Sequence, residues 1–143
     1  MADWYLTKDG DVSVLAMYER HYSARAYKDG RVRALFAGPG AKIVLRTRTA
    51  DAVFVWRKFI DASGQAGINC AVFRNEGAAR SSDLIRQADL IADAVWPGER
   101  HYTYVNARTI RSSNPGFCFI AAGWQPCGAT KSGLRILELP HSS

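Results

Sequence analysis

Apolar and polar positions along the chain group into short runs that predict both strands and helices. The runs 42–49, 53–60 and 68–73 are rich in β-branched and aromatic residues and are separated by turn residues, which is typical of strands. The second run is apolar on both faces, so it is predicted to be an internal strand. Alternation in the first run places one set of side chains on a common face, Lys42, Val44, Arg46 and Arg48. The three runs together predict an antiparallel meander.

A helical pattern follows over residues 82–95. Its apolar positions recur at helical spacing and form one face, Leu84, Ile85, Ala88, Ile91, Ala92 and Val95. The polar positions between them are expected to face water, namely Arg86, Gln87, Asp89 and Asp93. Ser81 or Ser82 is expected to cap the first turn, and the segment 96–98, Trp-Pro-Gly, to end the helix.

The last third of the chain predicts a strand, a polar loop, a short helix and a final strand. The strand 102–105 follows the long helix, so it is predicted to lie parallel to the strand 68–73 in a βαβ unit. Asn114 is expected to cap the helix 117–122, and Gly123 to close it in the left-handed conformation. A turn precedes the final strand, 134–139. A further short helix is predicted over residues 13–22. These elements predict one α/β domain over residues 1–143, with a mixed sheet flanked by helices.

Composition narrows the class of protein. A chain of 143 residues with 48% hydrophobic residues is long and apolar enough to bury a core, which argues against disorder. No apolar run approaches the ~20 residues of a membrane helix, and the N-terminus lacks the pattern of a signal peptide, so a soluble cytoplasmic protein is expected, with no membrane partner. Cys70, Cys118 and Cys127 show no C-x-x-C spacing, so they are interpreted as idle or buried thiols.

The formal charge of +6 is concentrated in the basic N-terminal part, residues 1–60. Between Arg20 and Lys58 there are ten basic residues and two acidic ones. Such a field attracts polyanions, so DNA is the expected partner, and a solvated basic face without a partner is the alternative. The residues expected to contact the DNA backbone are Arg46, Arg48, Arg57 and Lys58. Aromatic residues interleave with these charges and could stack on bases, namely Tyr22, Tyr27, Phe36 and Trp56.

The loop before the long helix is the predicted cofactor site. A strand that runs into a helix N-terminus presents unpaired N–H groups, which suit a phosphate. A plain helix start with Arg74 and Arg80 as surface charges is the alternative. The segment 74–79, Arg-Asn-Glu-Gly-Ala-Ala, matches the Arg/Gln-x-x-Gly-x-Gly/Ala motif of the GNAT acyltransferase superfamily at three positions, Arg74, Gly77 and Ala79.

The order of strand, Asn-containing loop and short helix ending in Gly-Trp also resembles the C-terminal half of that superfamily. The resemblance implies a GNAT-like fold and an acyl-coenzyme A donor held in the half 68–124. The residues expected to hold it, or to line the cleft beside it, are Arg74, Gly77, Ala79, Arg80, Ser81, Ser82, Asn106 and Asn114. Many members have a tyrosine acid where this chain has Phe119, so another hydroxyl, such as that of Tyr104, would serve as the catalytic acid.

The adjacent pair His21-Tyr22 in a basic segment resembles the Mom DNA-modification proteins of Mu-like bacteriophages. That resemblance implies group transfer to adenine N6 in phage DNA, in the host cytoplasm, with His21 and Tyr22 as catalytic residues and as ligands of iron. A surface histidine beside a packed tyrosine is the alternative. Three functions therefore stay open: Mom-like DNA modification, acyl-coenzyme A dependent N-acetylation of an amine, and DNA binding without catalysis. A homodimer is also expected.

Overall fold

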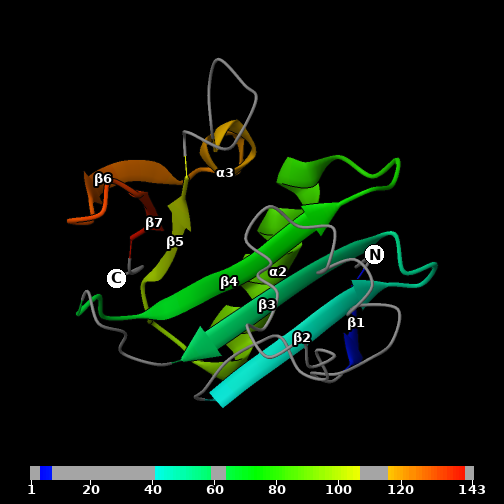
Figure 1. The fold of residues 1–143 in the computed structure, drawn as a ribbon. Helices are drawn as coiled ribbons and strands as arrows, with labels where there is room; N and C mark the ends of the chain where they lie inside the picture. The colour runs from blue at the N-terminus through cyan, green and yellow to red at the C-terminus, as the bar shows by residue number, and fades with distance from the viewer. Residues whose placement is uncertain (1–3, 8–40, 59–63, 107–115, 141–143) are drawn as a thin grey trace, which may run out of the picture.

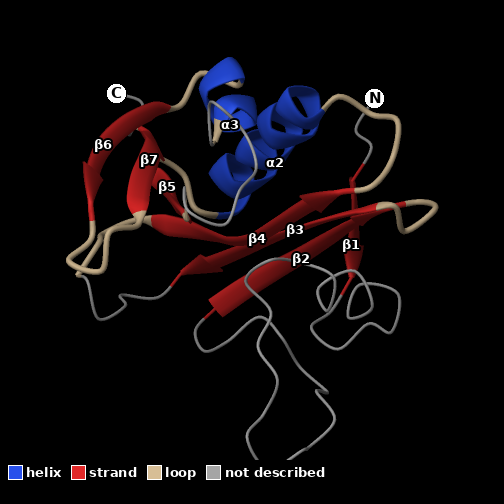
Figure 2. Cartoon of the chain, turned by 45° about the horizontal axis from the view of Figure 1, so that its top comes forward, coloured by secondary structure: helices blue, strands red, loops and turns tan. Residues whose placement is uncertain are grey.

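The computed structural model describes residues 4–7, 41–58, 64–106 and 116–140. These residues form a seven-stranded sheet, and both described helices lie on one face of it (Figures 1 and 2). The strand order is β1-β2-β3-β4-β5-β7-β6. The elements are β1 (Trp4–Thr7), β2 (Ala41–Thr47), β3 (Ala52–Lys58), β4 (Ile68–Asn75), α2 (Ser81–Val95), β5 (His101–Val105), α3 (Phe117–Ala121), β6 (Gln125–Ala129) and β7 (Arg135–Leu139).

The pairing of the strands confirms the predicted topology. Strands β2, β3 and β4 form the antiparallel meander, and β3 is internal, with residues 52–56 fully buried. Strands β4 and β5 are parallel, and α2 connects them, as the βαβ pattern predicted. Strands β5, β7 and β6 continue the sheet in antiparallel pairs. The sheet is therefore mixed, with one parallel pair near its centre.

Two strands, β1 and β6, were not predicted, and the end of β2 was predicted wrongly. The edge strand β1 is only four residues long, and β6 contains Pro126 and Gly128, which are weak strand formers tolerated at an edge. Strand β2 ends at Thr47, so the alternation does not extend to Arg48, which lies in a turn. That turn is fixed by the hydroxyl of Thr47, which accepts hydrogen bonds from the N–H groups of Asp51 and Ala52 at 3.0 Å each.

The helix ends also differ from the prediction. Helix α2 begins after Arg80, whose backbone is extended and whose side chain makes no capping hydrogen bond, so neither serine is its N-cap. Helix α3 begins after Gly116 rather than Asn114. Gly116 has φ +81°, and a Cβ there would lie 2.6 Å from a methyl carbon of Leu137, so only glycine fits. Gly123 takes the predicted left-handed conformation, with φ +102°.

The core lies between the sheet and α2. The indole N–H of Trp4 donates to the carbonyl of Leu84 at 2.8 Å, and that of Trp56 donates to the carbonyl of Ala88 at 2.9 Å. Two side chains from different strands thus hold successive turns of α2 against the sheet. Trp56 is fully buried, and its ring centroid lies 4.6 Å from that of Phe54. The helix is therefore fixed over β1 to β3 by both packing and hydrogen bonds.

Strands β4 and β5 part soon after they begin. Only Ile68, Asn69 and Cys70 pair with β5, although β4 continues to Asn75 (Figure 1). Along the other edge of β4, the neighbouring β3 residues Val55 and Trp56 pair with Val72 and Cys70. Ala71 is therefore an extra residue in β4, which forms a β-bulge. The sheet therefore opens in a V between β4 and β5.

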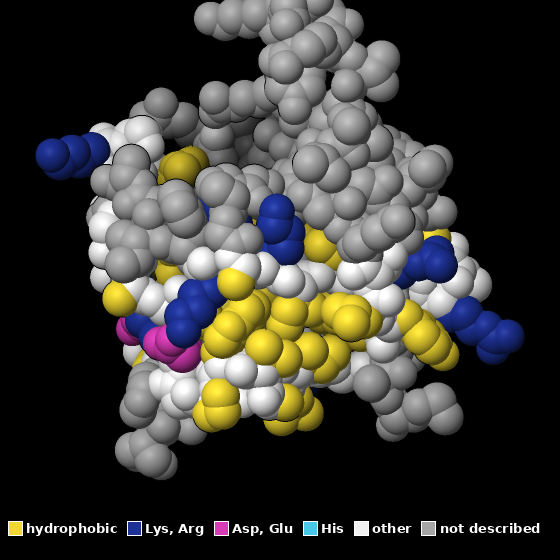
Figure 3. All heavy atoms as spheres, turned by 90° about the horizontal axis from the view of Figure 1, so that it is seen from below, with side chains coloured by type: hydrophobic (Ala, Val, Ile, Leu, Met, Phe, Trp, Pro, Cys, Tyr) yellow, Lys and Arg dark blue, Asp and Glu magenta, His cyan; other side chains and the backbone are white. Residues whose placement is uncertain are grey.

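The described surface exposes several large apolar side chains. They lie on the edge strand β1 and on α2, namely Tyr5, Leu6, Leu90 and Val95, so Val95 is not part of the buried helix face. Figure 3 shows apolar side chains gathered over one side of the molecule. Surfaces of this kind are used for contacts between chains, and the homodimer stays a prediction. Within the described ranges, neither helix combines the length and apolar character needed to span a membrane.

Trp56→Ala is expected to lower the free energy of unfolding by about 3–5 kcal/mol, because it leaves a cavity in the core and removes the hydrogen bond to Ala88. Leu90→Ala removes a side chain that is 70% exposed, so it is expected to change that free energy by less than about 0.5 kcal/mol. Urea unfolding of the wild type and both variants measures these differences. Similar losses in the two variants would contradict the described core.

Candidate functional site

The loop between β4 and α2 is shaped by the side chain of Asn75. Its amide N–H groups donate to the carbonyl of Ala79 at 2.7 Å and to the hydroxyl of Ser81 at 3.0 Å. Its amide oxygen accepts a hydrogen bond from the N–H of Gly77 at 3.0 Å. One side chain thus bonds to the loop at three points, so the backbone that leads into α2 is held in one conformation. Asn75 was not among the predicted site residues.

The turn between β2 and β3 contacts this loop through Asp51. The N–H of Glu76 donates to the carbonyl of Asp51 at 2.7 Å. Gly77 lies against the carboxylate of Asp51, and a Cβ at position 77 would collide with it. The hydroxyl of Thr47 holds that carboxylate in place. The glycine of the predicted phosphate motif is therefore explained by its close approach to Asp51, whatever the loop binds.

The first turn of α2 carries the polar side of the site. The carbonyl of Arg80 accepts from the N–H groups of Asp83 and Leu84, both at 3.1 Å. The N-cap side chain makes no capping bond to this turn, and α2 is 15 residues long. An uncapped helix N-terminus presents N–H groups and a partial positive charge, which attract an anion.

An open pocket of about 460 Å³ lies between this first turn and α3. Polar residues of α2 line one side and mostly apolar residues of α3 line the other, namely Arg80, Ser81, Ser82, Phe117, Cys118 and Ala121. The guanidinium of Arg86 on α2 donates to the carbonyl of Ala121 on α3, which links the two helices beside the pocket. Burial raises the pKa of the Cys118 thiol, so this group stays protonated near neutral pH. The side chain of Cys118 is half-buried in the wall of the pocket.

The structure brings together only some of the predicted cofactor residues. Arg80, Ser81 and Ser82 line the pocket. Arg74 instead forms an ion pair with Glu76 at 2.6 Å, and Ala79 accepts the hydrogen bond from Asn75. The α3 side of the pocket was not predicted, because the exposure of its apolar residues, such as Phe117 at 58%, is known only from the structure.

The other predicted site residues lie in different places. Tyr104 is in β5, just past its last pair with β4, and its ring packs edge-on against that of Tyr102 at 5.7 Å. Asn106 follows the end of β5. The other three predicted residues lie outside the described residues, namely His21, Tyr22 and Asn114. Among the residues that the structure does describe, no group of three or more His, Cys, Asp or Glu is placed to hold a metal ion.

The predicted DNA contacts are spread over both ends of β2 and β3. Arg46 lies in β2 and is half-buried, and Arg48 lies in the turn that follows. Arg57 is near the end of β3, where Lys58 forms an ion pair with Glu99 at 2.9 Å. That pairing reduces the charge that Lys58 offers to a polyanion.

A second polar cluster, which the sequence did not predict, lies in the core beneath α2. Asp89 was expected to face water but is only 6% exposed. One carboxylate oxygen lies 2.7 Å from Nδ1 of His101, and the other accepts a hydrogen bond from the indole N–H of Trp124 at 2.9 Å. Nε2 of His101 lies 3.4 Å from an oxygen of Asp93 but makes no hydrogen bond among the described residues. The cluster joins α2, β5 and the segment after α3.

Burial raises the pKa of the Asp89 carboxyl, because the charged form loses its hydration. The hydrogen bonds from His101 and Trp124 and the charge of His101 oppose that shift, and the charge of Asp93 adds to it. The folded protein therefore binds the Asp89 proton more tightly than the unfolded chain does. The stabilising contribution of this carboxyl is complete below its ordinary pKa of 3.8 and is lost as pH rises through the raised value.

Comparison with known proteins identifies the fold. No protein-family model matches the chain, and no curated protein sequence matches it. A crystal structure of an acyl-CoA N-acyltransferase from Pseudomonas aeruginosa is similar, with a TM-score of 0.58 and 14% sequence identity, over 99% of this chain and 100% of that one. The chain therefore has the GNAT-like α/β fold expected from its C-terminal half, a mixed sheet flanked by helices in a single domain.

Asp89→Asn is expected to remove one source of pH dependence in stability. The free energy of unfolding of the wild type minus that of the variant should fall as pH rises from 3.8 through the raised pKa of Asp89, because only the wild type must lose that proton. Urea unfolding at a series of pH values measures this difference. Asp83→Asn, on the exposed face of α2, is the control. A difference that grows with rising pH would show that burial is not the dominant influence on Asp89.

Proposed function

We propose that the protein is an N-acyltransferase that takes an acyl group from acyl-coenzyme A and passes it to an amine. The observation that carries this proposal is the pocket between the first turn of α2 and α3, next to the V between β4 and β5. The pocket combines an anion-attracting helix N-terminus with an apolar wall. That combination suits a ligand with phosphates and an apolar arm.

The phosphate end of such a donor fits the first turn of α2. The N–H groups of this turn, the guanidinium of Arg80 and the hydroxyls of Ser81 and Ser82 are all hydrogen-bond donors. Asn75 and Asp51 keep the loop in place without an ordered ligand. The donor site would therefore be largely formed before the donor binds, which reduces the entropy cost of binding.

The long arm of the donor fits the V in the sheet. From Ala71 to Asn75 one edge of β4 has no strand partner among the described residues, over about 13 Å at the usual rise of a strand. Peptide groups on that edge can form hydrogen bonds with the amide groups of an extended arm. The edge strand of a sheet binds an added extended peptide in the same way. Acyl-coenzyme A supplies a thioester whose carbonyl carbon an amine can attack. The arm would bring it towards the vertex of the V.

The similarity to an acyl-CoA N-acyltransferase supports the same proposal, since the two proteins share the fold along their whole length. Tyr104 stays a candidate for the acid that protonates the departing thiolate, since it lies beside the V. Phe119, at the position where many GNAT members have the tyrosine acid, is 7% exposed and packs against Trp124 at 4.8 Å. Its ring therefore belongs to the core.

Calorimetric titration with acetyl-coenzyme A tests the donor site. The wild type is expected to bind it, and Arg80→Ala is expected to weaken binding about tenfold, because a charge-assisted hydrogen bond to phosphate is lost. Lys131→Ala, which removes a cation from the exposed turn between β6 and β7, should leave binding unchanged. No binding by the folded wild type, or equal binding by the wild type and Arg80→Ala, would refute the proposed donor site.

Modification of an adenine amino group in DNA, in the manner of the Mom proteins, is a second candidate for the acceptor. It is favoured by cations on the sheet face opposite α2. Lys42 lies beside Arg57, and Arg46 and Arg74 both pair with Val53, so all four side chains belong to that face by alternation. The positive charge of this part of the sheet would attract the phosphates of DNA, although Arg74 is already paired with Glu76. The roles of His21 and Tyr22, and of iron, stay predictions.

Mass spectrometry of nucleosides tests this second candidate. DNA from cells that express the protein is expected to contain a new adenosine species, and DNA from cells that express His21→Ala is expected to lack it. Unmodified DNA from cells that contain folded protein would exclude DNA as the acceptor. The donor site would still be judged by the calorimetric titration.

A further inference from the structure

The side chain of Asn69 in β4 carries a buried oxygen that nothing described in the structure satisfies. The residue is 3% exposed, and its Oδ1 has no hydrogen-bond partner among the described residues. Buried polar groups in folded proteins nearly always have a partner, because leaving one unpaired is costly. An unpaired buried acceptor therefore indicates a place where a ligand donates a hydrogen bond.

The position of Asn69 connects it to the proposed transfer site. It is the second of three β4 residues that pair with β5, so it lies at the vertex of the V where the donor arm would end. Cys70 pairs with Trp56 and belongs to the core beneath α2. Asn69 is its neighbour in the strand, so its side chain lies on the opposite face. The unpaired oxygen thus faces away from the pocket that would hold the donor phosphates.

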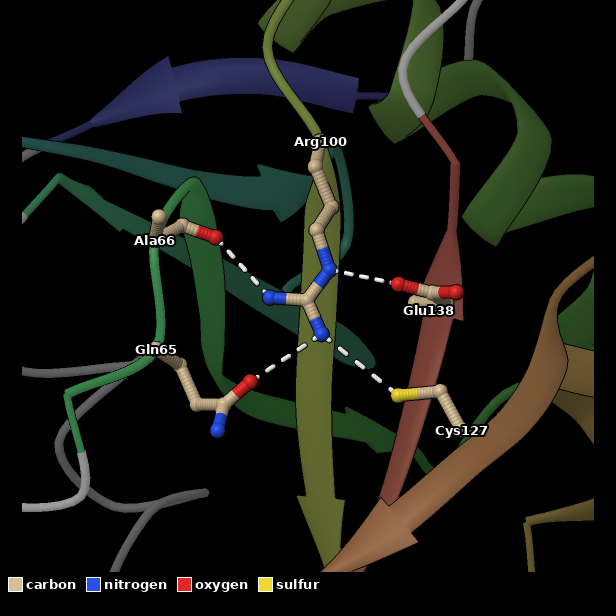
Figure 4. A network of polar contacts seen from close by, with 5 residues as sticks. All are labelled: Gln65, Ala66, Arg100, Cys127 and Glu138. Atoms are coloured by element: carbon tan, nitrogen blue, oxygen red, sulfur yellow. Dashed lines mark hydrogen bonds and ion pairs between the residues drawn. The ribbon is translucent and has the colours of Figure 1, made fainter.

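Neighbouring groups limit what this oxygen can bind. Asn69 pairs with Arg57 on β3 and with Tyr102 on β5. The guanidinium of Arg100 lies 5.0 Å from the centre of the Tyr102 ring, and its hydrogen bonds go to other groups, Gln65, the carbonyl of Ala66, Cys127 and Glu138 (Figure 4). Arg57 brings positive charge to this end of the sheet, where the charge of Arg100 is paired with that of Glu138. An ammonium ion is disfavoured there, whereas a neutral N–H group is not.

We propose that Asn69 is a positioning residue for the acceptor, and that its Oδ1 accepts a hydrogen bond from an N–H of a neutral primary amine. This inference rests on the proposed acyl transfer. With one N–H bonded to Asn69, the nitrogen lone pair is free to form a bond to the thioester carbonyl carbon. The bond from that carbon to sulfur then breaks, and one proton passes in net from nitrogen to sulfur, which yields an amide and a free thiol.

The proposal makes an unusual expectation for stability. Asn69→Leu keeps the shape of the side chain and removes its unpaired polar atoms, so the midpoint of thermal unfolding should stay the same or rise. Thr103→Val is the matched control at the same junction, because the hydroxyl of Thr103 does have a partner, the carbonyl of Cys70 at 3.0 Å. That variant should unfold at a lower temperature. A marked loss of stability in Asn69→Leu would show that its side chain is paired within the protein and would overturn the proposal.

Amine binding is tested by NMR with n-butylamine as the probe. The titration uses protein saturated with coenzyme A, which carries no acyl group and therefore does not consume the amine, and the affinity is expressed per neutral amine. The side-chain NH₂ signals of Asn69 should shift when the amine is added to the wild type. In Asn69→Leu, the affinity for the amine, derived from the shifts of neighbouring backbone amides, should be about three- to tenfold weaker. An amine that leaves Asn69 unperturbed, or binds both proteins equally, would overturn the proposal, as would a crystal structure with an ordered water on Oδ1 that the amine does not displace.

Steady-state kinetics separates a positioning role from a structural one. With n-butylamine as acceptor, Asn69→Leu should raise the KM for the amine and leave the KM for acetyl-coenzyme A unchanged. Equal changes in both constants would assign Asn69 a structural role and overturn the proposal. If acetyl-coenzyme A binds and Arg80→Ala weakens it while the amine avoids Asn69, only this inference fails. If acetyl-coenzyme A does not bind, the proposed function fails.

Discussion

The arrangement of the helices depends on the hydrogen bonds made by the Asp89 carboxylate. It is buried beneath α2 and bonds to His101 at the start of β5 and to Trp124 after α3. Burying a carboxyl is unfavourable unless it is well bonded, so these contacts restrict where the three elements can lie. Because α3 leads directly into Trp124, its place relative to the first turn of α2 follows from this restriction. The width of the candidate pocket therefore depends on a polar contact deep in the core.

A second constraint acts on the backbone of β4. Its first three residues pair with β5, and the rest of the strand pairs only with β3, past a bulge. The V that results leaves one strand edge open beside the pocket. Between Ala71 and Asn75 this edge has no strand partner among the described residues, so an added extended chain can lie along it. The pocket, the open edge and the unpaired oxygen of Asn69 follow one line along β4, so a single extended ligand and its reaction partner account for all three.

Most of the element order followed from local patterns. Strands β2 to β5 and helix α2 were predicted to within two residues at nearly every end, because each is long and has a clear period of apolar positions. The pocket-lining residues Arg80 to Ser82 were among the predicted site residues because a helix N-terminus can be recognised in the sequence. Asp89 was wrongly predicted to face water because it is charged. It lies four residues after Ile85 and three before Ala92, within the buried stripe, so its position in the helix already indicated burial.

The sequence by itself determined the kinds of elements, their order and the helix start at which an anion could bind. These depend on neighbours within a few residues, so their cause is local. Only the tertiary structure decided that α3 forms the second wall of the pocket, that Asp89 joins His101 and Trp124, and that Asn69 stays unpaired at the vertex of the V. Each of these involves groups 12 or more residues apart or the place where two strands part. Such contacts arise from packing of the whole sheet against its helices, and no periodicity along the chain encodes them.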